Sequence, residues 1–412
     1  MVSSAPLRAL ALLGLLLLAG CARAQALEMD HSETLRRALL DHDRAALARD
    51  PTLVAGKYAR MARTKFAFFR GTAWLHRPEP SRFAAEVAVI GDPHPENVGT
   101  FLLADRVRAI EFNDFDLAGY GPFTEDLRRL AVGLWIVADM ADLKHKQRVK
   151  LVEDMVGGYL AELEGLAQGK PPLALRADAL SGDLEEILAA PDSEAKEEPA
   201  SKEDEALARA VLAAYPRTLL VERPAAQFRL KSVSRRHAGV SSFAVLRLLA
   251  TVEGPTAAPS DDWTLELKES IGPAAQIVTI QRQFQERPDV DPLLGWAAVG
   301  GREFRVRQLL PGQRRLDAER LAKQVKSPNW GKKDLKDLGH ALGRLLARGH
   351  ALARGRDGKP GRIALAPAIA NGDALRAETV AHAEKRALLN TDDFHAFQQL
   401  LAARGPLLGW TK

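Results

Sequence analysis

Two polar segments at the ends of an alternating stretch constrain the fold of this chain more than any other feature. Residues 91–97 read GDPHPEN, and residues 113–119 read NDFDLAG. Between them, apolar residues alternate around Asp105 and Arg106, which predicts two short strands within 101–112 joined by a turn. Because the two ends of a hairpin meet, we expect both polar segments to lie close together and to form one site.

The side chains of these segments are of the types that phosphoryl transfer uses. They carry carboxylate, amide and imidazole groups: Asp92, His94, Glu96, Asn97, Asp114 and Asp116. In phosphoryl transfer one Asp accepts the proton of the attacking hydroxyl, while an Asn oxygen and a second Asp hold Mg²⁺ against the phosphates. A single imidazole suits a His-rich zinc site poorly. A merely solvated loop is disfavoured, because each cluster follows an apolar strand, the first of them predicted at 86–90.

The same residues resemble known motifs. Residues 91–97 resemble the catalytic loop Gly-Asp-x-His-x-x-Asn of the aminoglycoside-phosphotransferase and choline-kinase-like branch of the protein-kinase-like superfamily. A closer match is an uncharacterised bacterial family, domain of unknown function twenty-two fifty-two, which is similar in Phe-Phe-Arg-Gly, Gly-Asp-Pro-His-Pro-Glu-Asn and Asn-Asp-Phe-Asp. The resemblance implies that Asp92 is the catalytic base, that Asn97 and Asp114 bind Mg²⁺, and that Asp116 assists at the metal.

A β-rich region follows the polar segments. Three runs alternate with period two and predict strands of an antiparallel sheet: 228–233, 243–248 and 263–268. A helix is predicted at 274–284 and a further strand at 303–310. The resemblance implies that Lys268 pairs with the phosphates of a nucleotide. It also implies that the turn with Gly239, Ser241 and Ser242 covers these phosphates.

This order of parts differs from that of an ordinary kinase, in which the β lobe precedes the catalytic loop. Too few residues precede Asp92 to form such a lobe, so we expect an α+β, two-lobe, kinase-like fold that is circularly permuted. It would combine a small antiparallel β lobe with a mainly helical lobe. The alternative, a shortened lobe over 46–90 that uses Lys65, is disfavoured by its length. The helix position expected to hold a glutamate for Lys268 is Thr279.

The first 21 residues have the pattern of an export signal. An apolar stretch leads to Leu-Ala-Gly-Cys, and Cys21 is the only cysteine. The tetrapeptide resembles the bacterial lipoprotein signal, so we expect a lipid on Cys21 and a place at the periplasmic face of a bacterial membrane. The alternative is an ordinary cleavage after residues 22–24, which would give a soluble periplasmic protein.

Charge and pattern divide the chain further. Residues 182–205 hold ten acidic residues against two lysines, which indicates a solvated linker. The net charge of +5 is mild, and no basic stripe interleaved with aromatics indicates a nucleic-acid partner. We predict six parts: an export signal at 1–21, a tether with a first helix at 22–45, a catalytic-loop region at 46–182, an acidic linker at 183–205, a nucleotide-lobe-like region at 206–312 and a helical region at 313–412.

Three functions fit these observations. The favoured one is a phosphotransferase that uses Mg²⁺ and ATP, or another phosphoryl donor, on the hydroxyl of a small molecule or another acceptor. The second is a kinase-like binding lipoprotein without turnover. The third is a metal-dependent phosphohydrolase built on the two polar segments. The sequence names neither the acceptor nor the oligomeric state.

Overall fold

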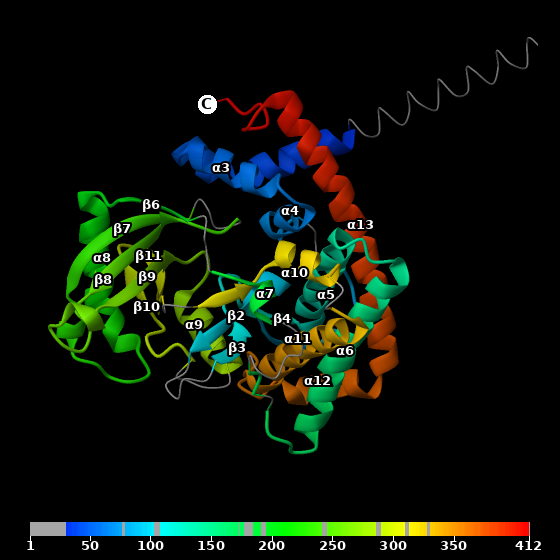
Figure 1. Cartoon of the computed structure of the whole chain (residues 1–412). Coiled ribbons are helices and arrows are strands. Elements are labelled where there is room, and N and C mark those ends of the chain that lie inside the picture. Colours follow the sequence, from blue (N-terminus) through cyan, green and yellow to red (C-terminus); the bar gives the residue numbers. More distant parts are fainter. Residues whose placement is uncertain are drawn as a thin grey trace, which may run out of the picture. The chain divides into compact units, whose positions relative to one another are not determined.

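The computed structural model describes residues 30–75, 79–102, 108–172, 174–176, 184–190, 195–240, 245–285, 290–309, 313–327 and 330–411. The predicted export signal and Cys21 lie outside the described residues. The chain forms two compact units (Figure 1): unit 1 comprises Met1–Leu75 and Leu388–Lys412, and unit 2 comprises His76–Ala387. No helix within the described ranges combines the length and the apolar character needed to cross a membrane.

Unit 1 is helical. Its helices are residues 30–42, α2 (Arg44–Arg49), α3 (Pro51–Met61), α4 (Lys65–Gly71) and the end of α13 (Gly372–Arg404). Asp50 caps α3 and Thr64 caps α4 through their side-chain oxygens. Phe68 is fully buried, with its ring centroid 5.2 Å from that of Phe397. Residues 46–75 are therefore mainly helical, which contradicts the alternative of a β lobe around Lys65, the first residue of α4.

The larger sheet of unit 2 has six antiparallel strands in the order β10-β11-β9-β8-β7-β6. Its strands are β6 (Lys196–Pro199), β7 (Leu230–His237), β8 (Arg247–Val252), β9 (Trp263–Glu269), β10 (Gly295–Val299) and β11 (Arg302–Gln308). The strands predicted at 263–268 and 303–310 are confirmed, and the strand predicted at 228–233 overlaps β7. The strand predicted at 243–248 is wrong in its bounds, because β8 starts at Arg247 and continues to Val252, buried at every position except Thr251.

Two helices cover the two faces of this sheet. The first is α8 (Lys202–Ala214), whose apolar residues join a core with Leu248, Leu267 and Val306. The second is α9 (Ala274–Phe284), which confirms the predicted helix and contacts β10, β11 and α11 (Figure 1). Its residue Gln281 accepts a hydrogen bond from Arg305. The side chain of Arg305 lies on the face of the sheet opposite the one that packs on α8. One face of the sheet is thus apolar, and the other carries charged side chains.

The acidic segment 183–205 lies inside unit 2 and carries regular structure. It contributes α7 (Leu184–Ile187), β5 (Leu188–Ala189), β6 and the start of α8. Its acids meet basic residues of β7: Glu198 lies 3.5 Å from His237, and Asp204 lies 2.8 Å from Arg235. β6 is thus exposed along its whole length, and its pairing with β7 makes it an edge strand of the larger sheet.

A smaller sheet positions the polar segments. Its order is β3-β2-β12-β5, with β2 (Val98–Leu102), β3 (Arg108–Phe112) and β12 (Arg314–Leu316). The register pairs Val98 with Phe112, which confirms the predicted hairpin and brings its ends together; the turn at 103–107 lies outside the described residues. A separate pair, β1 (Glu86–Val89) with β4 (Gly119–Pro122), flanks the two segments.

The remaining helices of unit 2 form a bundle. They are α5 (Phe123–Met140), α6 (His145–Ala167), α10 (Ala318–Val325), α11 (Lys332–Leu352), α12 (Arg362–Ala370) and the first part of α13. Contact between α6 and α11 is close, since a Cβ added at Gly158 would lie 2.1 Å from the carbonyl oxygen of His340. Helix α5 starts at Phe123, and the hydroxyl of its second residue, Thr124, donates to the carbonyl of Phe83.

Candidate functional site

A buried carboxylate holds the start of the first polar loop, residues 91–97. The backbone N–H groups of Ile90 and Gly91 donate to the two oxygens of Asp126, at 2.6 and 2.9 Å. Asp126 belongs to α5 and is 1% exposed, and His350 Nε2 lies 3.1 Å from it. On its other side, His350 Nδ1 lies 2.9 Å from the hydroxyl of Tyr159. Hydrogen bonds to a charged acceptor are strong, so this chain of contacts fixes the backbone just before Asp92.

Gly91 is required by the turn that presents Asp92. Its φ is +87°, a conformation that favours glycine. A Cβ at this position would also lie 2.3 Å from the carbonyl oxygen of Leu117 in the second polar loop, residues 113–119. The two loops therefore touch backbone to backbone at this point.

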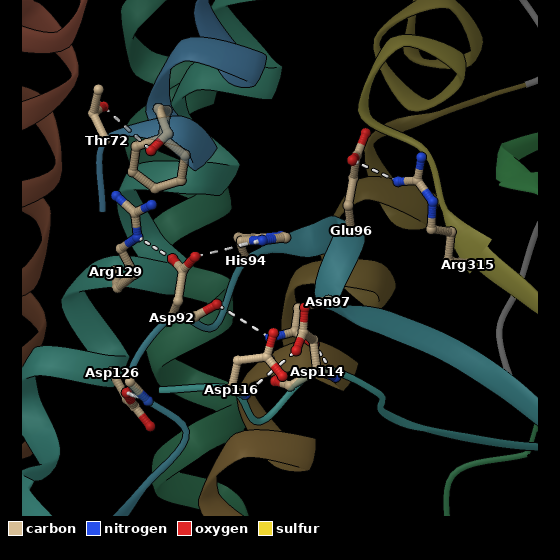
Figure 2. Close-up of polar contacts among 12 residues, drawn as sticks. Thr72, Asp92, His94, Glu96, Asn97, Asp114, Asp116, Asp126, Arg129 and Arg315 are labelled. Atoms are coloured by element: carbon tan, nitrogen blue, oxygen red, sulfur yellow. Dashed lines mark hydrogen bonds and ion pairs between the residues drawn. The ribbon is translucent and has the colours of Figure 1, made fainter. Parts of the chain in front are cut away.

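Asn97 joins the two loops from within (Figure 2). Its side-chain nitrogen donates to the carbonyl oxygens of Asp92, at 3.2 Å, and Asp114, at 2.8 Å. Its side-chain oxygen accepts from the backbone N–H of Asp114 at 2.6 Å. The residue is 2% exposed. Asn97, predicted as a metal ligand, thus links the two loops by hydrogen bonds in this structure. A metal ion could still be contacted through the second lone pair of its side-chain oxygen.

The carboxylate of Asp92 lies between a guanidinium and an imidazole (Figure 2). Arg129 of α5 donates from Nε to one oxygen at 2.6 Å, and His94 Nε2 lies 3.9 Å from the other. Glu96 turns away from them and pairs with Arg315 at 2.5 Å. Asp92 is therefore a fixed carboxylate with a cationic neighbour, whereas Glu96 anchors the loop to β12.

Three cations lie side by side on the charged face of the larger sheet. In the register, Arg247 of β8 is opposite Lys268 of β9, and Lys268 is opposite Arg305 of β11. Each is between 3 and 5% exposed. We call these residues the basic row. Like charges directly opposite one another destabilise a sheet, so the row needs anions close by.

The second polar loop supplies some of these anions. Asp116 forms an ion pair with Lys268, and its other oxygen lies 2.9 Å from Arg305. Asp114 lies 3.6 Å from the same guanidinium. Arg307 of β11 donates to the carbonyl of Asn113 at 3.1 Å. These contacts dock the loop on the sheet, so residues far apart in sequence converge.

The remaining anion comes from the sheet itself. Glu266, 1% exposed, lies 2.9 Å from Arg307 and 3.3 Å from Arg247. Burial disfavours its charged form, but the neighbouring arginines and Lys268 outweigh this and hold the pKa of Glu266 well below its usual range. The same balance applies to Asp114. The loss of hydration next to the protein disfavours its charged form, but the positive charges of Lys268, Arg305 and Arg307 hold its pKa far below the usual range. Both carboxylates are anionic at neutral pH.

The donor set fits Mg²⁺ bound together with phosphates. Among the described residues, no group of three or more His, Cys, Asp and Glu side chains is placed to hold a metal ion alone. Mg²⁺ is commonly bound through one or two carboxylates plus substrate phosphates and water. Asp114 is anionic, and 46% of its side chain is exposed, whereas Asp116 is paired with two cations. Asp114 is therefore the residue here that would hold the ion.

Other predicted residues lie elsewhere. Gly239 follows β7 with a φ of +78°, while Ser241 and Ser242 lie outside the described residues. Thr279, the expected glutamate position, is exposed, and its hydroxyl donates to the carbonyl of Ala275. The α9 residue that reaches the basic row is Gln281.

Sequence reasoning missed three residues of the site: Asp126, Arg129 and Arg305. The first two follow the second polar loop by only a few positions, and this closeness in sequence was the signal available for them. For Arg305 the available signal was its alternation with Arg307 on the strand predicted at 303–310, which indicates that both side chains share one face.

Comparison with known proteins places the chain in a family. A family model described as an uncharacterized protein conserved in bacteria (DUF2252) matches residues 49–197 and 181–400. Comparisons with curated proteins and with solved structures gave no match. The matched span includes both polar loops, Asp126 and the basic row. The chain therefore belongs to the bacterial family DUF2252.

Proposed function

We propose that this protein is a kinase-like, Mg²⁺-dependent phosphotransferase acting on a hydroxyl acceptor. One observation carries the proposal: Asp92, Asp114 and Lys268 converge although they come from three separate parts of the chain. Asn97 bonds to the backbone of both Asp92 and Asp114, and Asp116 pairs with Lys268. A carboxylate base, a metal-binding carboxylate and a phosphate-binding lysine are the parts that phosphoryl transfer requires.

The order of elements supports a permuted kinase-like assembly. The larger sheet follows the polar loops in sequence, and Lys268 lies on the third strand of the run β7-β8-β9. Helix α9 comes next, and β10 and β11 complete the sheet next to β9. In the proposal this sheet serves as the β lobe that the resemblance implies, placed after the catalytic loop. It belongs to the same compact unit as α5, α6 and α11.

The residues have distinct roles in the proposed reaction. The acceptor hydroxyl oxygen forms a bond to the terminal phosphorus, its proton passes to a carboxylate oxygen of Asp92, and the bond to the remaining phosphate chain breaks. Arg129 keeps the Asp92 carboxylate oriented. Lys268 holds phosphate oxygens, and Asp114 would hold Mg²⁺, which would neutralise phosphate charge. Asp126 fixes the loop that carries the base.

The test is the substitution Asp92→Asn, measured as phosphate release from ATP and Mg²⁺ with water as the acceptor. General-base catalysis contributes about 10²–10⁴-fold, so turnover should fall by that factor. The thermal shift produced by ATP and Mg²⁺ should stay as in the parent protein. Asp373→Asn is the matched control, because that side chain is fully exposed. Equal turnover in Asp92→Asn would contradict the assignment, and no shift with any nucleotide would contradict nucleotide dependence.

The second candidate function is a binding protein without turnover. The ion pair between Asp116 and Lys268 favours it, since a carboxylate of the protein engages the lysine that phosphates would need. In that case ATP would shift the melting temperature of the parent protein, while phosphate release would be absent in both the parent and Asp92→Asn.

A further inference from the structure

The basic row contains more positive charge than one phosphate-binding lysine explains. Together with Arg307 it brings four cations to one sheet face, against the carboxylates of Glu266, Asp114 and Asp116. All four cations are largely buried. Unpaired buried charge is costly, so each cation must have an anion, and the kind of anion differs along the face.

Two parts of this charged face can be distinguished. Arg247 and Arg307 share Glu266, which lies on the adjacent strand β9 and is 1% exposed. Lys268 and Arg305 share Asp116, which comes from a loop and keeps 20% of its side chain exposed. Glu266 is thus a built-in counter-ion of the sheet, whereas Asp116 reaches its partners from outside the sheet.

The guanidinium of Arg305 is only partly satisfied by these partners. Nη1 donates to the oxygen of the Gln281 side chain at 3.1 Å, which fixes the plane of the group. Nη2 lies 2.9 Å from Asp116, while the buried Nε has no hydrogen-bond partner among the described residues. Nε and Nη2 form one edge of the guanidinium, the edge that binds two oxygens of a phosphate or carboxylate side by side. Asp116 engages half of that edge.

We propose that Lys268 and Arg305 form a seat for the phosphate chain of a linear triphosphate, and that Asp116 occupies this seat until the ligand displaces it. The inference rests on the proposed function and names its donor class. The phosphate chain carries the recognition, so inorganic triphosphate and a nucleoside triphosphate both bind. Arg305 is then a specificity-determining residue that the lysine motif alone does not reveal.

The geometry explains why a phosphate chain suits this seat better than Asp116 does. Adjacent strands lie about 4.8 Å apart, so Lys268 and Arg305 can contact neighbouring phosphate groups at the same time. A phosphate oxygen pair fills both donors on the edge of Arg305, including the Nε that Asp116 leaves unsatisfied. Released from the seat, Asp116 returns to solvent on its loop.

The experiment measures binding of inorganic triphosphate and of ATP to the full chain by calorimetry, with EDTA present to remove divalent cations. We expect both ligands to bind with affinities within about tenfold of each other. Arg305→Gln should weaken both at least tenfold, as should Lys268→Met. Asp116→Asn should tighten both about tenfold, because it removes the competing charge but keeps the shape of the side chain.

Arg302→Gln is the matched control. It removes a guanidinium from the same strand, but its partner is Glu269, at 2.8 Å, away from the basic row. The affinity of Arg302→Gln for inorganic triphosphate and for ATP should equal that of the parent protein. Folding of each variant is checked by its melting temperature, and in Asp116→Asn a lower melting temperature without ligand should be restored by triphosphate.

The outcomes separate this inference from the proposed function. Unchanged affinity in Arg305→Gln, or weaker affinity in Asp116→Asn, overturns the seat even if the protein releases phosphate from ATP. Conversely, tight triphosphate binding that depends on Arg305, with no turnover in the parent protein, supports the seat and contradicts the phosphotransferase. Binding of ATP but not of inorganic triphosphate would show that the base carries recognition, which also overturns the inference.

Discussion

The two halves of the candidate site are held by different kinds of contact. The first polar loop is fixed by backbone hydrogen bonds to Asp126, an acceptor that is almost fully buried, and by the hydrogen bonds of Asn97. Lys268 and Arg305 of the basic row are balanced instead by ion pairs to Asp116, a partly exposed carboxylate on a loop. The buried hydrogen bonds to the backbone allow only one geometry of the loop, whereas an exposed counter-ion can be replaced by another anion. The half with the proposed base, which we call the rigid half, is therefore preorganised. In the half with the proposed phosphate seat, which we call the exchangeable half, the counter-ion can be replaced.

The largest expected effect on stability comes from a substitution in the rigid half. Asp126→Ala leaves the N–H groups of Ile90 and Gly91 and the ring of His350 without their buried acceptor. Loss of one partner of a buried charged network costs about 3–5 kcal/mol, so the free energy of unfolding in urea should fall by that amount. Asp139→Asn, on the same helix but paired at the surface with Arg148, should change it by less than about 1 kcal/mol. Equal losses in both variants would contradict a special role for Asp126.

The next effect concerns the balance of charge near the basic row. Burial raises the pKa of Asp291 from 3.8 to about 6, although the charges of Arg307, Arg305 and Arg282 oppose the shift. The folded state therefore favours the protonated acid. The stability from this group is fully present below pH 3.8 and is lost as the pH rises through 6.

Asp291→Asn should remove this dependence. Two pKa units correspond to about 3 kcal/mol, so at pH 7.5 the variant should be more stable than the parent by up to that amount, and at pH 4.5 by much less. Urea unfolding at both pH values measures the difference. A gain that is the same at both values would contradict the buried, protonated carboxyl.

The rigid half was the more predictable from sequence. The hairpin at 98–112 and the polar loops follow from local alternation and from a contiguous motif, which need no knowledge of distant residues. Asp126 lies outside both polar segments, so the contiguous motif did not identify it. Its contact with Gly91 depends on how α5 packs beneath the loop, and no local pattern encodes that packing.

The exchangeable half was less predictable, because the register between strands decides which of its side chains are neighbours. Alternation predicted β9 and β11, and therefore placed Lys268 and Arg305 on strands. That the two are direct neighbours follows from the pairing of Arg305 with Lys268, which local sequence does not specify. The acidic segment shows the same limit, since its charge run does not specify that β6 pairs with β7 in the folded sheet.

A smaller effect sharpens the description of the loop turn. Gly91→Ala introduces a Cβ that lies 2.3 Å from the Leu117 carbonyl oxygen, in a conformation with φ of +87°. Strain and forced displacement together should lower the free energy of unfolding by about 2 kcal/mol. Gly300→Ala is the control, because its φ is +59° but its Cβ would meet nothing within 4 Å. That variant should lose about 1 kcal/mol, and urea unfolding of both separates strain from the backbone contact between the two loops.

The smallest effect tests which residue of α9 belongs to the exchangeable half. Thr279→Glu restores the carboxylate that the kinase resemblance leads one to expect, but at an exposed position. The free energy of unfolding should change by less than about 0.5 kcal/mol, and triphosphate affinity should not change. Gln281→Glu instead puts a charge on the fully buried partner of Arg305, 3.1 Å from its guanidinium, and should weaken triphosphate binding several-fold. If Thr279→Glu changed the affinity and Gln281→Glu did not, α9 would present its other face to the basic row, and the assignment of Gln281 as the α9 partner of Arg305 would be wrong.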